Sequence, residues 1–192
     1  MNSFKLLFSP IKIGKMEVRN RIVMPPMSQG YAAGLDGTVT ERGIHYYEAR
    51  AKGGVGLIIV EATAVNDARK HLPISPGLFD DKQIPSWRKL AKAVHGHGAK
   101  LATQLMDGGP ESLSFLSGVQ PTGPSPVAGR MFRQTPRELS IEEIEGVIDD
   151  FAEAVRRGRE AGLDAIEIHA AHGYAMVGSF LSPFFNKRTD IY

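Results

Sequence analysis

Residues 54–63 read GVGLIIVEAT, and the run within them from Gly56 to Glu61 decides the fold class. This run is short, rich in Ile, Leu and Val, and shows little alternation of apolar and polar positions. Strands that are buried on both faces of a parallel sheet have this composition. Three further runs share it and are predicted to be strands: Arg21 to Met24, Lys100 to Leu105, and Asp164 to His169.

The segments between these runs have the periodicity of amphipathic helices. The clearest one begins at Ser140, where Glu143 completes a capping box, and ends at Gly162. Two earlier helices are expected, one from Thr40 towards Gly53 and one from near Pro85 to Gly98. Strands alternating with helices predict an α/β fold with a parallel sheet and right-handed crossovers. The apolar positions of the last helix recur three and four residues apart, at Ile141, Ile144, Ile148, Phe151 and Val155.

The composition excludes several classes of protein. The formal net charge is +2, with 23 basic and 21 acidic residues scattered along the chain, so neither a nucleic acid nor a membrane surface is an expected partner. The absence of cysteine excludes disulfides and iron–sulfur clusters within these 192 residues. No signal peptide or membrane-spanning stretch is evident, and a cytoplasmic location is expected.

Two segments fall outside the alternation of strands and helices. Residues 8–18 are predicted to contain a hairpin, with strands at Ile11–Ile13 and Met16–Val18 and a turn at Gly14-Lys15. Residues 107–139 hold many Gly, Pro and Ser and show no clear periodicity. Loops of this length in compact domains are usually functional or disordered.

Polar groups collect where each predicted strand ends, which is where parallel barrels place their catalytic side chains. The sharpest cluster is His169, His172 and Tyr174. Two imidazoles leaving one strand can each donate an N–H to one oxygen atom, and the tyrosine could supply a proton to the adjacent carbon. A metal site or two histidines satisfied by backbone groups are the competing interpretations. The other strand ends read Pro25-Pro26-Met27-Ser28-Gln29, Glu61-Ala62-Thr63 and Gln104-Leu105-Met106-Asp107.

The remaining polar candidates carry weaker signals. Gln104 could form hydrogen bonds with the amide-like edge of a ring or make a structural hydrogen bond. Ser28 could donate a hydrogen bond to a carbonyl or form a hydrogen bond within a turn. The side chain of Ala62 is small, which would allow a flat ring to approach closely. His45, His71, His95 and His97 are expected to be solvated, and Asn186, Arg188 and Asp190 to form a hydrogen-bonded structural loop.

Several stretches together resemble the Old Yellow Enzyme family, in particular its 2,4-dienoyl-CoA reductase and NADH:flavin oxidoreductase branch. The resemblance covers nearly the whole chain, and HAAHGY followed by FLSP and N-x-R-x-D-x-Y is specific. The matching stretches are NRIVMPPM at 20–27, YYEARAKGGVGLIIVEAT at 46–63, PRELSIEEI through EIHAAHGY at 136–174, FLSP at 180–183 and NKRTDIY at 186–192.

The resemblance implies that residues 1–192 are the N-terminal half of an FMN-binding (β/α)8 TIM barrel, an incomplete barrel with only its first four strands. It places three groups against the flavin: the segment Pro26, Met27 and Ser28, then Ala62, then Gln104. It makes His169 and His172 the ligands of a substrate carbonyl oxygen and Tyr174 the proton donor. The implied reaction passes a hydride from NAD(P)H through FMN to the C=C of an α,β-unsaturated carbonyl or enoyl-CoA compound.

The chain departs from the family pattern in three places. After the third strand it reads QLMDGGP where the family shows Q-L-x-H-x-G-R, so Asp107 and Pro110 replace a His and an Arg. Five residues, Ala175 to Ser179, stand where the family has four. Strands five to eight, with the phosphate-binding loops, are not in these residues. A four-strand half would expose two sheet edges, which predicts a homo-oligomer or a complementary half-barrel as partner.

Two alternatives stay open. One is a non-catalytic half-barrel that acts only in assembly. The other is a different class of FMN barrel, such as a dihydroorotate-type dehydrogenase, which the HAAHGY signal disfavours.

Overall fold

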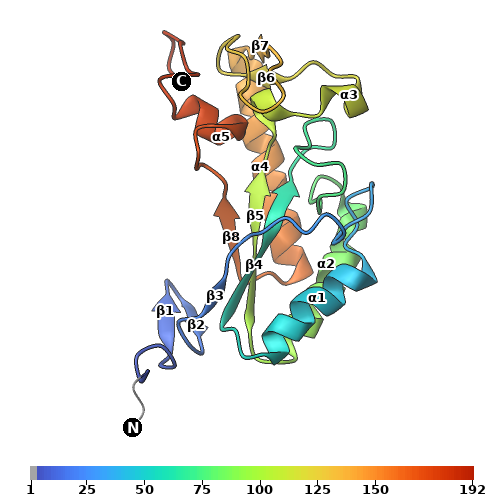
Figure 1. The fold of residues 1–192 in the computed structure, drawn as a ribbon, viewed down its shortest axis with the longest axis vertical. Helices are drawn as coiled ribbons and strands as arrows, with labels where there is room; N and C mark the ends of the chain where they lie inside the picture. Colours follow the sequence, from blue (N-terminus) through green and yellow to red (C-terminus); the bar gives the residue numbers. More distant parts are fainter. Residues whose placement is uncertain (1–3) are drawn as a thin grey trace.

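A four-stranded parallel sheet forms the centre of the computed structural model, which describes residues 4–192 (Figure 1). The strand order in space equals the order in the chain. Register pairs Val23 with Leu57, Leu57 with Lys100, and Ala102 with Ala165. All four predicted strands and their parallel pairing are therefore confirmed. The strands are β3 (Val23–Met24), β4 (Leu57–Ala64), β5 (Lys100–Met106) and β8 (Ala165–Ile168).

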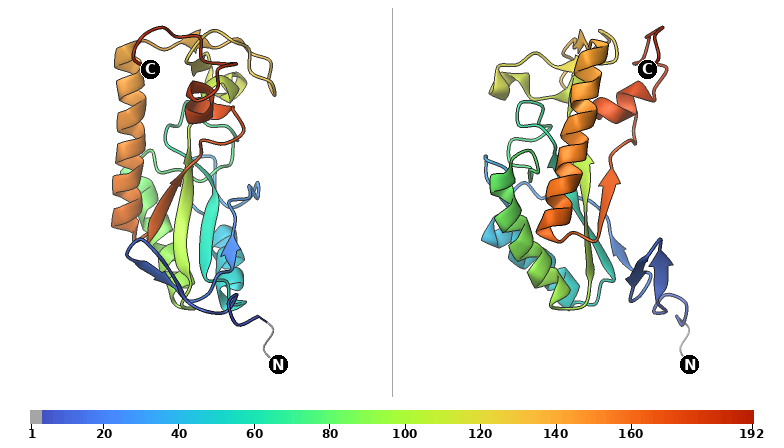
Figure 2. Two further views of the ribbon diagram at one scale, coloured as in Figure 1. Left: turned by 90° about the vertical axis from the view of Figure 1, so that its left-hand side faces the viewer. Right: turned by 180° about the vertical axis from the view of Figure 1, so that it is seen from behind.

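Three helices cover one face of this sheet (Figure 2). They are α1 (Glu41–Lys52), α2 (Ile84–His95) and α4 (Ile141–Ala161). The main apolar core lies between them and the sheet, where Trp87, Leu90 and Leu101 have no exposed surface. Burial of this apolar surface is the main force that holds the helices on the sheet.

The predicted helix caps are present. Thr40 accepts a hydrogen bond from the Gly43 amide at the start of α1. Ser140 and Glu143 form a reciprocal capping box at the start of α4, and Gly162 ends that helix with φ +92°. Such a left-handed ending favours glycine, since any side chain would be strained there. The second helix ends at His95, before the predicted Gly98.

The opposite face of the sheet meets the N-terminal hairpin. Its strands β1 (Ile11–Ile13) and β2 (Met16–Val18) pair in antiparallel register, with Ile11 opposite Val18. Val18 packs with Leu57 and Ala102 in a second, smaller apolar cluster. The hairpin thus lies at the amino ends of the strands, opposite the end to which the strand arrows point (Figure 1).

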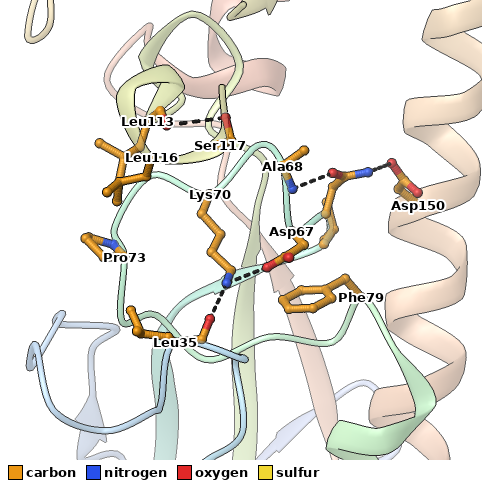
Figure 3. Close-up of a pocket in the computed structure, with 12 residues that line it drawn as sticks. Leu35, Asp67, Ala68, Lys70, Pro73, Phe79, Leu113, Leu116, Ser117 and Asp150 are labelled. Carbon is orange, nitrogen blue, oxygen red and sulfur yellow. Dashed lines mark hydrogen bonds and ion pairs between the residues drawn. The ribbon is translucent and has the colours of Figure 1, made fainter. Parts of the chain in front are cut away.

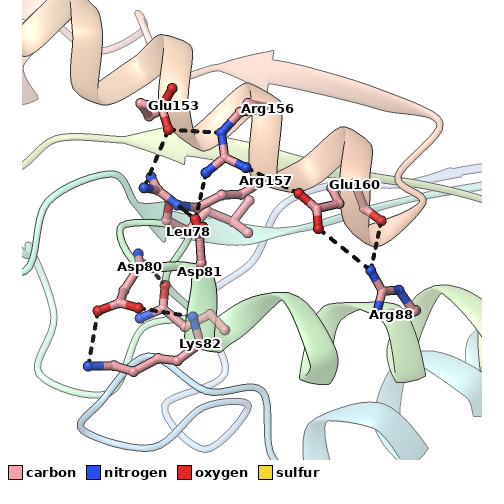
Figure 4. A network of polar contacts seen from close by, with 10 residues as sticks. Leu78, Asp80, Asp81, Lys82, Arg88, Glu153, Arg156, Arg157 and Glu160 are labelled. Atoms are coloured by element: carbon pink, nitrogen blue, oxygen red, sulfur yellow. Dashed lines mark hydrogen bonds and ion pairs between the residues drawn. The ribbon is translucent and has the colours of Figure 1, made fainter.

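A polar network ties α4 to the short helix η1 (Asp81–Gln83) that precedes α2 (Figure 4). Arg156 and Arg157 both donate to Asp81 Oδ1, at 2.6 and 2.7 Å. Arg157 also donates to the Leu78 carbonyl at 3.1 Å. Two guanidinium groups of α4 thus share one carboxylate of η1, which links the two helices.

The long loop has more local structure than its lack of periodicity predicts. It contains η2 (Gly109–Glu111), α3 (Ser114–Ser117), β6 (Thr122–Gly123) and β7 (Arg137–Glu138). The five residues from Ala175 belong to a further helix, α5 (Ala175–Phe180). Strands and helices of two to four residues leave no hydrophobic period for a sequence pattern to reveal.

The apolar stripe of α4 is only partly covered. Ile144 is buried, whereas Ile141, Ile148 and Val155 are 45%, 48% and 40% exposed. Part of the stripe lines an apolar groove of about 450 Å³ with β8, α5 and the end of the chain. The groove is lined by Ile144, Val147, Ile148, Phe151, Ile168, Met176, Val177, Phe180, Leu181 and Tyr192.

Across residues 4–192, none of the helices combines the length and apolar composition that are needed to cross a bilayer.

Candidate functional site

The predicted site residues lie at the carboxyl ends of the strands, the end that also carries α5 and the 107–139 loop (Figure 1). His169 directly follows β8, and Asp107 directly follows β5. Parallel strands bring their carboxyl ends to one edge, so residues far apart in the chain meet there.

The structure brings His169, His172 and Tyr174 together. The ring centroids are 5.8 Å apart for the two histidines and 5.3 Å apart for His169 and Tyr174. The Tyr174 hydroxyl lies 3.4 Å from His169 Nε2. His169 is buried and His172 is exposed, so the cluster reaches from the interior to the surface.

An unusual backbone turn presents these side chains. His172 and Ala175 have φ of +67° and +55°, and Gly173 between them has φ +58°. Such angles cost a non-glycine residue roughly 1–3 kcal/mol, although His tolerates them better than most residues. The turn is held from outside: the Met176 amide donates to the Asp107 carbonyl at 3.0 Å.

Burial lowers the pKa of His169, and the neighbouring His172 and His71 act in the same direction. His169 is therefore neutral at neutral pH. Nε2 faces the Tyr174 hydroxyl, whereas Nδ1 is buried and has no hydrogen-bond partner among the described residues. A proton on Nε2 can therefore be donated to an oxygen atom beside Tyr174. Burial also raises the pKa of Tyr174, as does Glu111, so the phenol stays protonated. The cluster can donate to an oxygen atom and supply a proton.

Ala62 and Gln104 are direct neighbours in the register of β4 and β5. Gln104 Nε2 donates to Glu167 Oε1 on β8 at 2.7 Å, so a small side chain, an amide and a carboxylate form a row across three strands. Sequence reasoning missed Glu167, although its place two residues before His169 is a signal that it lies at the strand end.

The segment after β3 lies beside the end of β4. The Gln29 amide donates to Glu61 Oε2 at 2.8 Å, which fixes the position of this segment. Within it Pro26 is half-buried, and Met27 and Ser28 are exposed. The small Ala62, the Gln104 amide and the free Ser28 side chain are chemically suited to the edge of a flat heteroaromatic ring such as the flavin of FMN.

The prediction that His71 is solvated is wrong. Its ring lies half-buried against Tyr174, with centroids 5.6 Å apart and planes 61° apart. It also lines a small cavity with Ala62 and Met106. The residue lies in the irregular connection between β4 and η1, and no spacing in the sequence links it to the strand ends.

Asp107, where the chain departs from the family pattern, has an ion-pair partner in the structure. Asp107 is fully buried, and Arg69 Nε donates to it at 2.6 Å. Arg69 also pairs with Asp150 of α4. Asp107 Oδ1 accepts from the Gly109 amide at 2.9 Å. This anchor joins the loops after β4 and β5 to α4 and supports the turn that carries Tyr174.

A pocket of about 650 Å³ lies elsewhere (Figure 3). It opens beside the loop after β4 and is lined in part by Lys70, Phe79 and Leu116. Lys70 donates to the Leu35 carbonyl at 2.6 Å and pairs with Asp67 at 2.5 Å, so its charge is already satisfied. None of the predicted site residues lines this pocket. Within residues 4–192, no group of three or more His, Asp or Glu side chains is placed to hold a metal ion.

Comparison with known proteins gives consistent matches. The pattern of the NADH:flavin oxidoreductase / NADH oxidase family matches residues 6–192. The NADH oxidase of Thermoanaerobacter brockii is 45% identical over an alignment of 194 positions, which covers 100% of this chain and 30% of that protein. The NADPH dehydrogenase of Listeria monocytogenes is 42% identical over 97% of this chain and 54% of its own length. The crystal structure of Old Yellow Enzyme from Pichia sp. AKU4542 superposes with a TM-score of 0.90 at 30% identity, covering 99% of this chain and 52% of that one. The chain thus spans about half, or less, of the length of these relatives.

Proposed function

The chain belongs to the NADH:flavin oxidoreductase / NADH oxidase family, and we propose from this premise that it carries the substrate-activating part of an FMN-dependent ene-reductase. The substrates are α,β-unsaturated carbonyl or enoyl-CoA compounds, and NAD(P)H is the reductant. The observation that carries the proposal is the position of the Tyr174 hydroxyl 3.4 Å from His169 Nε2, which brings a phenol and an imidazole nitrogen to the same place.

In this proposal, FMN supplies hydride transfer to the β-carbon when it is bound. Ser28, Ala62 and Gln104 would hold its ring. His169 and His172 donate to the substrate carbonyl oxygen and stabilise the negative charge that develops there. Tyr174 protonates the α-carbon. The raised pKa of Tyr174 keeps this proton available through neutral pH.

The test combines FMN titration with enone reduction. Saturable FMN binding with a perturbed visible spectrum is expected. His169→Ala should lower kcat/KM by roughly 10²–10³-fold, the usual cost of one donor to a developing oxyanion. Tyr174→Phe should lower kcat by roughly 10²–10⁴-fold, because general acid catalysis contributes that much. His45→Ala, on the exposed side of α1, is the matched control. Equal activity in all three variants contradicts the proposal.

A second candidate is a half-barrel that needs a complementary half or a second copy. The apolar groove along α4, β8 and α5 favours it, since Ile168 and Leu181 on its wall are 53% and 70% exposed. β8 also lies at the edge of the sheet. Sedimentation should show self-association or assembly with a partner half, whereas a compact, stable monomer argues against this candidate.

A further inference from the structure

A chain of aromatic contacts leads away from Tyr174 into the 107–139 loop. Tyr174 contacts His71 with centroids 5.6 Å apart, His71 contacts Phe132 at 6.2 Å, and Phe132 contacts Phe115 at 6.3 Å. All three separations lie within the range of attractive ring pairs. We call these four side chains the aromatic track.

A buried carboxylate holds the middle of the track in place. Glu111 has no exposed surface, and its two oxygens accept from the amides of Met131 and Phe132 at 2.9 and 3.0 Å. A Cβ on Gly129 would lie only 2.7 Å from Glu111 Oε1, so the loop closes tightly around this carboxylate. Because the anchor uses backbone amides, the Phe132 ring is positioned without contributing to the anchor itself.

The inner end of the track adjoins the proposed site. His71 lines a cavity with Ala62, which the proposed function places at the flavin, and its ring contacts Tyr174. His71 Nδ1 lies 3.4 Å from the Glu111 carbonyl, so the same loop segment also orients this ring. At the outer end, Phe115 is 69% exposed.

We propose that the aromatic track selects acceptors that carry a flat aryl substituent on the unsaturated carbonyl. This inference rests on the proposed function, since His169 and Tyr174 hold the carbonyl end of the acceptor. The substituent lies along His71 and Phe132, which act as specificity-determining residues. A preordered aromatic wall gains contact energy without an ordering cost, and it gives less to a short alkyl group.

The test compares two acceptors that share one enone: 4-phenyl-3-buten-2-one and 3-penten-2-one, in which methyl replaces phenyl. The wild-type protein should prefer the phenyl compound in kcat/KM. Phe132→Ala should lower that preference by roughly two- to tenfold, the equivalent of one ring pair, because it lowers kcat/KM for the phenyl compound more than for 3-penten-2-one. Phe8→Ala removes a 61% exposed ring outside the track and should change neither rate.

A binding measurement separates this inference from the proposed function. Saturation-transfer difference NMR without NAD(P)H should show strong transfer to the phenyl protons in wild type and weak transfer in Phe132→Ala. If this NMR result is obtained but neither the wild type nor a variant reduces the acceptors, the proposed reaction is refuted and the aryl site is supported. Turnover with an unchanged phenyl preference in Phe132→Ala overturns the inference. If the wild-type protein shows neither turnover nor saturation transfer to the phenyl protons, both the proposed function and this inference are overturned.

Discussion

Neutralising Asp107 tests whether the buried anchor stabilises the fold. Asp107→Asn keeps the shape of the side chain and its acceptor for the Gly109 amide, but it removes the charge and replaces the oxygen that accepts from Arg69 Nε with an NH2 group. The Asp107 side chain is 0% exposed and that of Arg69 is 20% exposed. Breaking a buried pair costs about 3–5 kcal/mol. Arg69 keeps Asp150, whose side chain is 33% exposed, so we expect the lower end, about 3 kcal/mol.

Urea unfolding followed by circular dichroism measures this loss. With an m-value of about 2 kcal/mol/M, the midpoint should fall by about 1.5 M. Glu41→Gln is the control, because Glu41 pairs with Lys89 at 3.2 Å while their side chains are 69% and 67% exposed. Such a surface pair contributes less than about 1 kcal/mol. A midpoint for Asp107→Asn equal to that of the control would refute the reasoning.

Two further predictions concern the backbone and the pH dependence of the same end of the sheet. Burial raises the pKa of Glu61 above its ordinary value of 4.5, although hydrogen bonds from the Gln29 amide and the Tyr47 hydroxyl oppose the shift. The contribution of Glu61 to the free energy of unfolding should therefore be largest below about pH 4.5 and fall as the pH rises through the folded pKa. In urea titrations across that range, Glu61→Gln should remove this part of the pH dependence of the free energy of unfolding. Gly109→Ala should lower the melting temperature more than Gly118→Ala: both glycines have positive φ, but only at Gly109 would the new Cβ meet another backbone atom, the Met176 nitrogen, at 2.7 Å. Equal losses in the two variants would mean that this contact relaxes freely.

Local and periodic features of the fold were predictable from the sequence. The strand residues Leu57 to Val60 are all apolar because both faces of the strand are largely buried, and the start of α4 follows from the Ser140 and Glu143 pair alone. The cluster of His169, His172 and Tyr174 was predictable because all three residues leave one strand end within six positions.

Features held by distant polar partners were not predictable. His71 contacts the Tyr174 ring, and its Nδ1 lies 3.4 Å from the carbonyl of the distant Glu111. Likewise Asp107 finds Arg69 across two loops, and neither residue has a spacing that signals the other. A single hydrogen bond or ion pair between distant segments creates no periodic pattern, so only the folded chain reveals it.

The strands of this sheet have the same order in space as in the chain, and this has a consequence for folding during synthesis. As the protein leaves the ribosome, each new strand finds its partner in the strand that emerged before it, with Leu57 beside Val23 and Lys100 beside Leu57. Synthesis runs from the N-terminus, and neighbouring strands of this sheet are always consecutive in its chain order. No strand of this sheet must wait for a later one to be paired on one side, so the sheet can grow by successive addition, with its newest edge always at the most recently synthesised strand.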